Sequence, residues 1–450
     1  MILKRKIYNK IREWKRLSNG ETALMIEGAR RTGKSTIAEE FAKNEYDSYM
    51  ILDFAKEGME VRRNFEENIG DLDAFFRNLF VLKGQSIKEK KSVIIFDEVQ
   101  LFPTARQAIK YLVNDGRYDY IETGSLISIK QNVKDILIPS EEFKLKLYPM
   151  DFEEFLWAKE DMATMPVIKE AFRNRKSLGA DIHRKIMQVF RSYLVVGGMP
   201  QAVSAFIEGQ TYQEIDFIKK NILSLYEEDL KKYDGTNSEK ASVILKTIPE
   251  QLTNRNSHFK MTAVDKNARY KNYIDAINFI AESMIGNACI NVTNPEVTLE
   301  LYADRSNFKL YMGDTGLLIT QIMGNSDAAD ENLYKSLIFN KLGINQGMII
   351  ENMVAQMLKS QGHDLFFHEF LHKSEAATNV SKYEIDFLTV RNKRICPIEV
   401  KSSSYKSHRS FDCFLKKYNL KANDRYIIYT KDLQTREDII YIPLYMTSLI

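Results

Sequence analysis

The segment ALMIEGARRTGKSTIAEEFA contains a loop flanked by glycines. A lysine and two hydroxyl residues follow at the end of this loop. An apolar run precedes it and a helical pattern begins at Lys34, which is the setting that a phosphate-binding loop requires. Glycines let the backbone N–H groups point inward at a phosphate, and the helix start adds partial positive charge. We expect Lys34 to reach the β- and γ-phosphates of a nucleotide and Ser35 to ligate Mg²⁺. The expected phosphate-binding residues are Gly28, Ala29, Arg30, Arg31, Thr32, Gly33, Lys34, Ser35 and Thr36.

Two carboxylates follow a second apolar run, in KSVIIFDEVQ. Asp97 is expected to hold the same magnesium ion, directly or through water, and Glu98 to orient and polarise the attacking water. A third run, YDYIETGS, ends in Thr123 and Ser125, which we expect to sense the γ-phosphate. In this order, and each after a buried strand, the three segments predict binding and hydrolysis of a nucleoside triphosphate.

A second candidate site lies in YEIDFLTVRNKRICPIEVK, where charged and apolar residues alternate as in a β-strand. A hairpin with Asn392 and Lys393 as its two-residue turn would place Asp386 opposite Glu399. Two carboxylates across a ladder repel by up to about 1 kcal/mol unless a cation lies between them, and Mg²⁺ suits such oxygen ligands. The opposite face of the hairpin is expected to hold its apolar residues, Ile385, Phe387, Ile398 and Val400.

The same register places Glu384 opposite Lys401, whose ammonium group could position water or stabilise a charged phosphate transition state. The pattern Glu351, Asp386, Glu399-x-Lys401 resembles that of the PD-(D/E)xK nucleases. By that resemblance Glu351, in the first turn of a predicted helix, would point into the same cleft and help to hold a second Mg²⁺ or a Mn²⁺ ion. The alternative is a salt-bridged hairpin in which Glu384 and Lys401 neutralise each other and no metal binds.

The elements that must position these residues alternate between strand and helix over the first third of the chain. YMILDF and EEFKLKLYPM add two strands to those already named, and helices are expected near residues 71 to 82 and 105 to 114. Such alternation predicts a parallel sheet with ligands at the carboxyl edge of its strands.

Helical patterns continue to about residue 235, and they are expected to form a lid or a connector. The next segment reads as three helices and two strands, which is the order of a winged helix-turn-helix. Thr262 would cap its second helix, and Arg269 and Lys271 would start the third, where a recognition helix meets DNA. A protein-docking or inter-domain module is the alternative for this segment.

Six motifs in this order, EGARRTGKST, VIIFDEVQ, ETGS, LYPMDFEEFL, YLVVGGMPQAV and FKLYMGDTGLL, resemble those of bacterial and archaeal AAA-type ATPases that carry a C-terminal region called DUF4143. The resemblance implies ATP as the nucleotide and an ATPase core followed by helical, winged-helix and nuclease-like segments. It identifies no arginine finger, for which Arg106 and Arg117 are candidates.

The predicted fold class is α/β, with a P-loop parallel sheet followed by a helical lid, a winged helix and a PD-(D/E)xK-like domain. The expected domains are 1–150 (AAA-type ATPase core), 151–235 (helical lid or connector), 236–315 (winged helix) and 316–450 (nuclease-like, DUF4143 region).

The leading hypothesis is a cytoplasmic ATPase whose nucleotide state controls a C-terminal half that binds or cuts DNA. One alternative is a nucleotide-gated switch or scaffold that binds a protein partner and cuts nothing. Another is a Mg²⁺-dependent nuclease with a regulatory P-loop. A homo-oligomer is compatible with each hypothesis. A membrane partner is not expected, because no apolar run approaches the ~18 residues that span a bilayer and the first twenty residues lack a secretory signal. The net charge of +3 is too small to name a partner.

Overall fold

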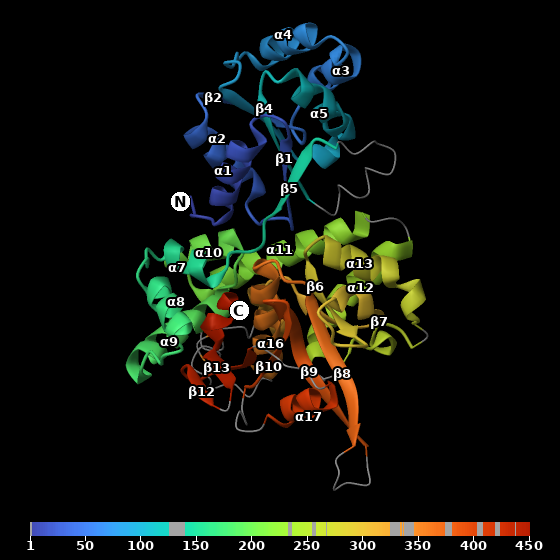
Figure 1. Ribbon diagram of the computed structural model, residues 1–450. Coiled ribbons are helices and arrows are strands. Elements are labelled where there is room, and N and C mark those ends of the chain that lie inside the picture. Colours follow the sequence, from blue (N-terminus) through green and yellow to red (C-terminus); the bar gives the residue numbers. More distant parts are fainter. Residues whose placement is uncertain are drawn as a thin grey trace. The chain divides into compact units, whose positions relative to one another are not determined.

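The chain folds into two compact units (Figure 1). The computed structural model describes residues 2–125, 140–232, 236–253, 258–266, 268–324, 334, 336, 346–373, 380–402, 408–418, 424–436 and 438–450. The first unit comprises Met1–Tyr148, Ser224–Ser238 and Glu282–Met284, and the second comprises Pro149–Leu223, Glu239–Ala281 and Ile285–Ile450. The four predicted domains therefore do not correspond to four separate compact units.

A five-stranded sheet forms the centre of the first unit, with strand order β2-β3-β4-β1-β5. All of its neighbouring strands are parallel, as the alternation of strands and helices predicts. The strands are β1 (Ala23–Gly28), β2 (Ser48–Asp53), β3 (Ser92–Asp97), β4 (Asp119–Ser125) and β5 (Glu142–Lys146). Because β4 lies between β1 and β3, the ends of these three strands meet at one edge of the sheet.

Helices cover both faces of this sheet, so that its strands are buried on both sides. Trp14 and Phe41 pack with Ile26 in one core cluster. Phe65 packs with Phe96 in the other. The helices are α1 (Ile7–Ser18), α2 (Lys34–Glu45), α3 (Met59–Asn68), α4 (Leu72–Lys83) and α5 (Pro103–Asp115). This packing explains the nearly continuous apolar runs of β1 and β3.

Helices dominate the chain from residue 152 to 253, which includes the predicted connector (151–235) and the first helix of the predicted winged helix. α7 begins with a capping box, in which the Asp151 and Glu154 side chains accept each other's backbone N–H groups. The helices are α7 (Phe152–Ala158), α8 (Thr164–Asn174), α9 (Ala180–Val196), α10 (Pro200–Ile207), α11 (Tyr212–Lys232) and α12 (Thr236–Thr253). Helix α11 begins in residues of the second unit and ends in residues of the first.

The predicted winged helix is not formed as expected. Its second helix is a single 3₁₀ turn, Met261–Ala263, in which Thr262 is not the cap, and Arg269 and Lys271 precede helix α13 (Ile274–Glu282) instead of starting it. In the short TAVDKN segment, the β-branched Thr and Val lose side-chain freedom in a helix, and Asp and Asn favour turns, so a segment of this length cannot offset the entropy of nucleating a helix. Asn267 lies outside the described residues.

The two strands predicted for the wing belong to the eight-stranded sheet of the second unit, with order β12-β13-β11-β10-β9-β8-β6-β7. β6 pairs with β7 in antiparallel and with β8 in parallel orientation. The strands are β6 (Gly286–Val292), β7 (Ala303–Met312), β8 (Leu365–Lys373), β9 (Val380–Arg391), β10 (Arg394–Val400), β11 (Arg425–Tyr429), β12 (Gln434–Arg436) and β13 (Ile439–Pro443). The predicted boundary at residues 315 and 316 is therefore wrong, since one sheet contains strands from both sides of it.

Helices α14 (Thr315–Met323), α16 (Gln346–Ser360) and α17 (Arg409–Tyr418) pack with this sheet. Phe411 and Phe414 of α17 belong to an apolar core that also contains Ile385 and Ile427. Asn352 of α16 is fully buried, and its side chain binds the backbone of Met312 at the end of β7. Polar residues of α16 thus attach the helix to the strand that precedes α14.

The motifs YLVVGGMPQAV and FKLYMGDTGLL meet at a junction of glycines in the second unit. Gly197 has φ +83 and ψ −172, a conformation essentially restricted to glycine, and a Cβ there would clash with the Asp314 carboxylate. A Cβ on Gly198 would clash with the Met150 backbone. The Asp314 carboxylate accepts hydrogen bonds from Gly198 N–H (2.6 Å) and from Leu317 N–H (3.0 Å), which caps α14. The junction joins the C-terminal end of α9 to the start of α14 through backbone contacts.

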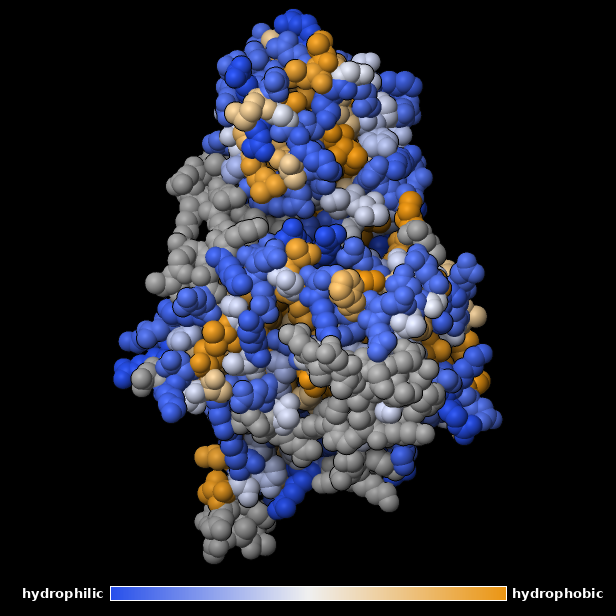
Figure 2. Space-filling view, turned by 180° about the vertical axis from the view of Figure 1, so that it is seen from behind, coloured by the Kyte–Doolittle hydropathy of each residue, from blue (hydrophilic) through white to orange (hydrophobic). Residues whose placement is uncertain are grey.

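Among the described residues, no helix combines the length and apolar character needed to cross a bilayer. Figure 2 shows one face of the molecule, on which hydrophilic residues predominate and hydrophobic residues form small separate groups. Small groups of this kind are usual on protein surfaces.

Replacing Gly197 with alanine should destabilise the second unit by at least about 2 kcal/mol more than the same change at Gly209, because a methyl group at Gly197 meets the Asp314 carboxylate. Gly209 has nearly the same φ, +82, but a Cβ there meets no atom within 4 Å, so Gly209→Ala is the reference for a glycine of positive φ without a clash. Urea unfolding of both full-length variants measures the difference. Equal unfolding midpoints would contradict the importance of the junction.

Candidate nucleotide site and acidic cluster

The backbone between β1 and α2 forms a tight loop whose glycines are required by geometry. A Cβ on Gly28 would lie 2.5 Å from the Leu147 carbonyl oxygen. Gly33 has φ +93 at the N-terminus of α2, where a side chain would be strained. The buried Thr32 hydroxyl donates to the Ala29 carbonyl at 2.8 Å and fixes the turn from inside. The loop therefore has the shape that the sequence pattern predicts for a phosphate cradle.

Residues distant in sequence hold this loop from outside. The buried Arg5 guanidinium donates to the Thr32 carbonyl at 2.9 Å. The Arg30 guanidinium pairs with Asp229 at 2.9 Å, and the Tyr226 hydroxyl donates to the Arg30 carbonyl at 3.1 Å. Sequence patterns gave no sign of these contacts, since they join residues 27 to 199 positions apart.

Lys34 lies inside the loop, with 7% of its surface exposed. Its ammonium group donates to the carbonyls of Gly28 (3.1 Å) and Ala29 (3.0 Å). Burial lowers the pKa of Lys34 to about 8, while the charges of Glu98 and Asp97 oppose this shift. A buried ammonium group at this position can neutralise a phosphate that approaches the loop.

Two of the predicted residues converge on the carboxylate of a third, Asp97, at the edge of the sheet. Ser35 Oγ donates to Asp97 Oδ1 at 2.6 Å, and the Thr123 hydroxyl donates to the same oxygen. The β4 strand makes this possible, because Thr123 is the register partner of Ile26 in β1. Hydroxyl and carboxylate oxygens are the donors that Mg²⁺ prefers, so Ser35 and Asp97 fit the metal that the fold implies. Ser125 ends β4, and its side chain lies outside the described part of the chain.

Glu98 follows Asp97 in a left-handed conformation, with φ +55. Such a backbone is uncommon for a residue other than glycine, and strained residues of this kind cluster at functional sites. The buried Gln100 side chain donates to a Glu98 carboxylate oxygen and thereby orients it. Gln100 is a site residue that the sequence pattern did not reveal.

Both candidate arginine fingers are held in ion pairs within the first unit. Arg106 Nε and Nη2 bind the two Glu142 oxygens at 2.8 and 2.7 Å, and both side chains are almost fully buried. Arg117 binds Asp115 and Asp73. Breaking a buried pair leaves an uncompensated charge, so Arg106 is not available to reach a neighbouring site. Arg106 is therefore not supported as an arginine finger, whereas the ion pair of Arg117 with Asp73 is exposed and does not decide its role.

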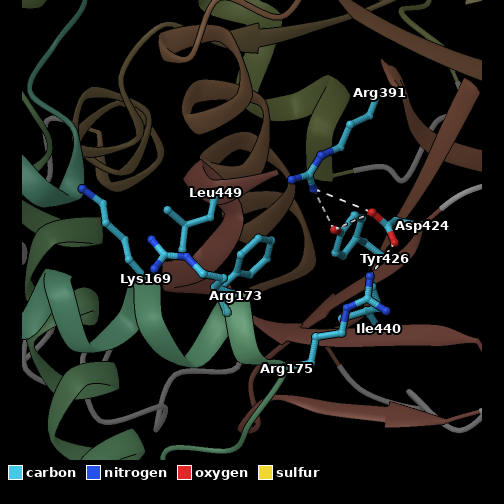
Figure 3. Close-up of a pocket in the computed structure, with 9 residues that line it drawn as sticks. Lys169, Arg173, Arg175, Arg391, Asp424, Tyr426, Ile440 and Leu449 are labelled. Atoms are coloured by element: carbon cyan, nitrogen blue, oxygen red, sulfur yellow. Dashed lines mark hydrogen bonds and ion pairs between the residues drawn. The ribbon is translucent and has the colours of Figure 1, made fainter. Parts of the chain in front are cut away.

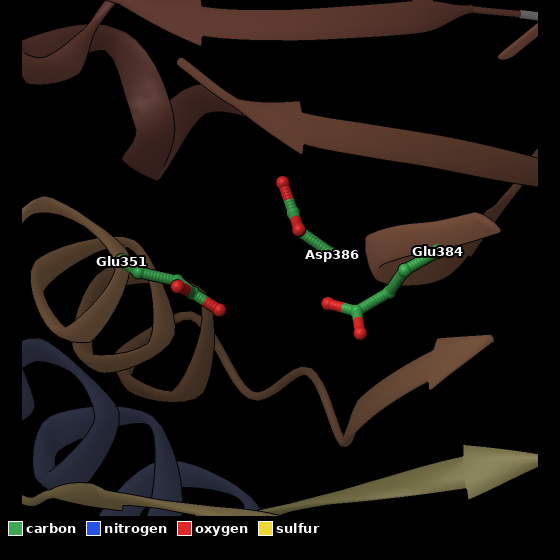
Figure 4. A group of neighbouring side chains, drawn as sticks. All are labelled: Glu351, Glu384 and Asp386. Atoms are coloured by element: carbon green, nitrogen blue, oxygen red, sulfur yellow. The ribbon is translucent and has the colours of Figure 1, made fainter. Parts of the chain in front are cut away.

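In the second unit, three carboxylates from two elements form a cluster (Figure 4). One oxygen each of Glu351 from α16 and of Glu384 and Asp386 from β9 lie within 4.8 Å of one another. The Lys309 ammonium group on β7 pairs with Glu351 at 3.0 Å and with Glu384, and the Tyr311 hydroxyl donates to Glu351 at 2.6 Å. Lys309 and Tyr311 were not predicted, because only the sheet pairing brings β7 to this site.

The predicted hairpin is present, with Asn392 and Lys393 in its turn at φ +51 and +58. Its ladder follows the predicted register from Arg391–Arg394 to Phe387–Ile398. The expected pairing of Asp386 with Glu399 does not continue this ladder. Asp386 Oδ2 instead accepts a hydrogen bond from the Val400 backbone N–H at 2.7 Å, while the charge of Glu399 still contributes to raising the pKa of Asp386.

A register shift in β9 breaks the predicted alternation of faces. Phe366 of β8 pairs with Leu388, whereas His368 pairs with Ile385, so β9 has one extra residue in this interval. Ile385 belongs to the core with Phe411, but the Phe387 ring contacts Tyr311, at a centroid distance of 5.8 Å. The prediction that Ile385 and Phe387 share one face is therefore wrong.

The ion pairs also differ from the expected ones. Lys401 pairs with Glu399 at 2.9 Å, and Glu384 pairs with Lys309 instead of Lys401. Burial lowers the pKa of Lys401, but the charges of Glu399, Asp386 and Glu384 outweigh it and raise the pKa overall. Lys401 thus remains charged beside the cluster, and Glu384 does not neutralise it.

The charges of this region do not balance. Four carboxylates, those of Glu351, Glu384, Asp386 and Glu399, accompany two ammonium groups, those of Lys309 and Lys401, which leaves two negative charges. Burial, with the charge of Glu351, raises the pKa of Asp386 well above its ordinary value, and burial also raises the pKa of Glu384. A divalent cation carries the charge that would complete the balance, and carboxylate oxygens suit Mg²⁺ or Mn²⁺.

Three family models match the chain. Residues 20–156 match an AAA domain, 187–328 a domain of unknown function (DUF8612) and 346–447 a domain of unknown function (DUF4143). With the parallel sheet and the loop geometry, the first match shows that residues 20–156 form an AAA domain with a P-loop. The C-terminal residues 346–447 are similar to the DUF4143 family. The acidic cluster joins two matched segments, because Lys309 and Tyr311 come from the second and the three carboxylates from the third.

Several solved structures are distantly similar. A Walker-type ATPase of Pyrococcus abyssi is 13% identical with a TM-score of 0.43, over 71% of this chain and 96% of that chain. Cdc6p of Pyrobaculum aerophilum is 10% identical with a TM-score of 0.25, over 76% of this chain and 97% of that chain. A chain of the Drosophila ORC bound to DNA is 13% identical with a TM-score of 0.25, over 72% of this chain and 96% of that chain. No curated protein matches. The function is therefore best inferred from the residues of this chain.

The affinity of the first unit for ATP should fall as the pH rises above about 8. Lys34 is protonated below its lowered pKa of about 8 and neutral above it, so phosphate binding at high pH requires proton uptake. The fall should approach tenfold per pH unit between pH 8.5 and 10. Fluorescent ATP titrations measure it. Lys34→Met should bind weakly and without this pH dependence, whereas Lys43→Met, at an exposed position of the same helix, should keep it. A flat profile in the unchanged chain would contradict this role of Lys34.

Proposed function

We propose that this chain binds ATP with Mg²⁺ at the P-loop of its first unit and hydrolyses it. The observation that carries the proposal is the convergence of Ser35 and Thr123 on one oxygen of Asp97, beside the buried Lys34. When bound, Mg²⁺ would neutralise charge that develops on the phosphates. The oxygens of Ser35 and Asp97 would hold it.

The side chains around the loop have separate roles in this proposal. The loop backbone and Lys34 bind the β- and γ-phosphates, and Lys34 exchanges its bonds to the Gly28 and Ala29 carbonyls for phosphate oxygens. The Glu98 carboxylate, oriented by Gln100, holds the attacking water and accepts its proton. The Thr123 hydroxyl senses the γ-phosphate.

Helix α11 offers a route by which the nucleotide could influence the rest of the chain. In the first unit, its Asp229 pairs with Arg30 of the P-loop. In the second unit, its buried Lys219 donates to the Val195 carbonyl at 2.8 Å and the Gly316 carbonyl at 3.3 Å, next to the glycine junction. We propose that a change at Arg30 on nucleotide binding shifts this helix.

Glu98→Gln should lower the rate of phosphate release at least 100-fold and leave ATP affinity within about threefold, because the amide cannot accept the proton of water. Glu66→Gln, an exposed change in the same unit, serves as the matched control. Steady-state phosphate release and ATP titration separate the two effects. A variant rate equal to that of the unchanged chain would refute the assignment of Glu98. Stimulation by added DNA would favour action on nucleic acid over a protein-binding switch.

A second candidate function is cleavage of nucleic-acid phosphodiesters by the second unit, favoured by the unbalanced charge of the acidic cluster. A divalent ion held by Asp386, Glu351 and Glu384 would supply a Lewis acid and an activated water. Lys401 is 27% exposed and keeps its charge, so it could stabilise a phosphate oxygen. A scaffold that binds a protein partner and cuts nothing remains the alternative, in which Lys309 and a proton or metal ion serve only to balance the cluster.

Asp386→Asn should weaken Mn²⁺ binding to the second unit at least tenfold, because it removes a ligand and one negative charge. Titrations of Mn²⁺ in a Ser35→Ala background, which weakens the P-loop site, measure the effect. Asp181→Asn, whose side chain is 95% exposed, is the matched control. Lys309→Met should tighten Mn²⁺ binding, since it removes a competing positive charge.

Cleavage of labelled single- and double-stranded DNA and RNA tests the reaction itself. If the second unit is a nuclease, cleavage requires Mn²⁺ or Mg²⁺, disappears in Asp386→Asn and persists in Lys34→Ala. Mn²⁺ binding without cleavage of any probe would favour the scaffold. Absence of a second Mn²⁺ site would rule out the metal centre.

A further inference from the structure

A basic pocket of about 370 Å³ lies in the second unit, apart from the acidic cluster (Figure 3). Its walls come from the last turns of α8, the end of β9, and β11 and β13. The polar side chains that line it include Lys169, Arg173, Arg175, Arg391, Asp424 and Tyr426. No motif in the sequence predicts a site here, because these residues come from three distant parts of the chain.

The pocket carries more positive charge than its own acid balances. Lys169 is neutralised by Glu153, at 2.6 Å. Asp424 is shared by two guanidinium groups, those of Arg175 at 2.8 Å and Arg391 at 3.8 Å. Arg173 is exposed and has no acidic partner among the described residues. The pocket therefore contains three arginines and one carboxylate that is not paired with Lys169, which leaves two positive charges.

The arginines are held in place by the shared groups of the pocket. Figure 3 shows Arg391 and Arg175 on opposite sides of Asp424, with Arg173 beside Leu449. Arg391 also donates to the hydroxyl of Tyr426 at 3.0 Å, and Tyr426 is only 2% exposed. Its ring stacks against Phe172, at a centroid distance of 6.2 Å and an angle of 15°. Arg175 follows α8 in a left-handed conformation, φ +52, and its guanidinium group is oriented by the ion pair with Asp424.

We propose that this pocket binds a phosphomonoester group, such as the 5′-phosphate of a nucleotide or of a nucleic-acid strand. Guanidinium groups present paired N–H donors that match phosphate oxygens. A phosphomonoester carries a charge of about −1.5 to −2 at pH 7, which matches the surplus of the pocket. The pocket volume also accommodates the sugar next to the phosphate. The proposal is independent of ATP hydrolysis and of the acidic cluster.

Equilibrium binding of three probes tests the proposal at low salt in EDTA, with the full chain carrying Lys34→Ala so that the P-loop does not contribute. The probes are inorganic phosphate, AMP, and a short single-stranded oligonucleotide with either a 5′-phosphate or a 5′-hydroxyl. The phosphorylated oligonucleotide should bind at least fivefold more tightly than its hydroxyl counterpart, and inorganic phosphate should compete with it. AMP that binds as tightly as the oligonucleotide would identify a free nucleotide as the ligand, and weaker AMP binding would identify a strand end.

Arg173→Gln should abolish the preference for the 5′-phosphate, because it removes an exposed arginine that pairs with no described acid. Arg184→Gln is the matched control: its charge change is the same, and its partner Asp181 is itself exposed. Arg184→Gln should leave the preference unchanged. Equal affinity for both oligonucleotides in the Lys34→Ala chain, or equal losses in the two arginine variants, would overturn the proposal. Unchanged circular dichroism and thermal unfolding of Arg173→Gln confirm that the fold is intact.

Discussion

A buried charge must be balanced by an opposite charge or by hydrogen bonds, and this requirement organises the sites of both units. At the P-loop, two carbonyls hold the Lys34 ammonium group, and burial still lowers its pKa. At the acidic cluster, Lys309 balances only part of the negative charge, and the pKa of Asp386 is raised. These charges are the reason that we propose an anionic ligand at the first site and a divalent cation at the second.

Close approach of backbones sets the frame around these charges. Gly28 lets the P-loop pass the Leu147 carbonyl, and Gly197 and Gly198 let the end of α9 pass Asp314 and Met150. The two groups of glycines look alike in the sequence but differ in their roles. Those of the P-loop shape a cradle of N–H groups, whereas those of the second unit let a buried carboxylate cap α14. The glycines of the second unit therefore contribute to the stability of the fold.

The two candidate reactions rest on different kinds of support. For the first unit, the loop, the residues around Asp97 and the match to an AAA domain agree, and together they support the proposal of ATP binding and hydrolysis. For the second unit, the support is the geometry and charge of a cluster to which β7 contributes Lys309 and Tyr311. Because that strand lies outside the segment matched to DUF4143, the cluster belongs to the whole sheet, and a fragment of residues 346–447 would lack part of it.

Local patterns in the sequence determined the parallel sheet of the first unit and the P-loop with Ser35 and Asp97. They also determined the turn and the initial register of the β9–β10 hairpin. Each of these features depends on neighbouring residues or on a short spacing. The tertiary structure alone decided that β6 and β7 join the C-terminal sheet, that Lys309 replaces Lys401 as the partner of Glu384, and that Arg106 is occupied by Glu142. It also placed one extra residue in β9, which turned Phe387 toward Tyr311. These outcomes depend on strand order and on the balance of buried charges, and both are set by contacts between residues that no local pattern connects.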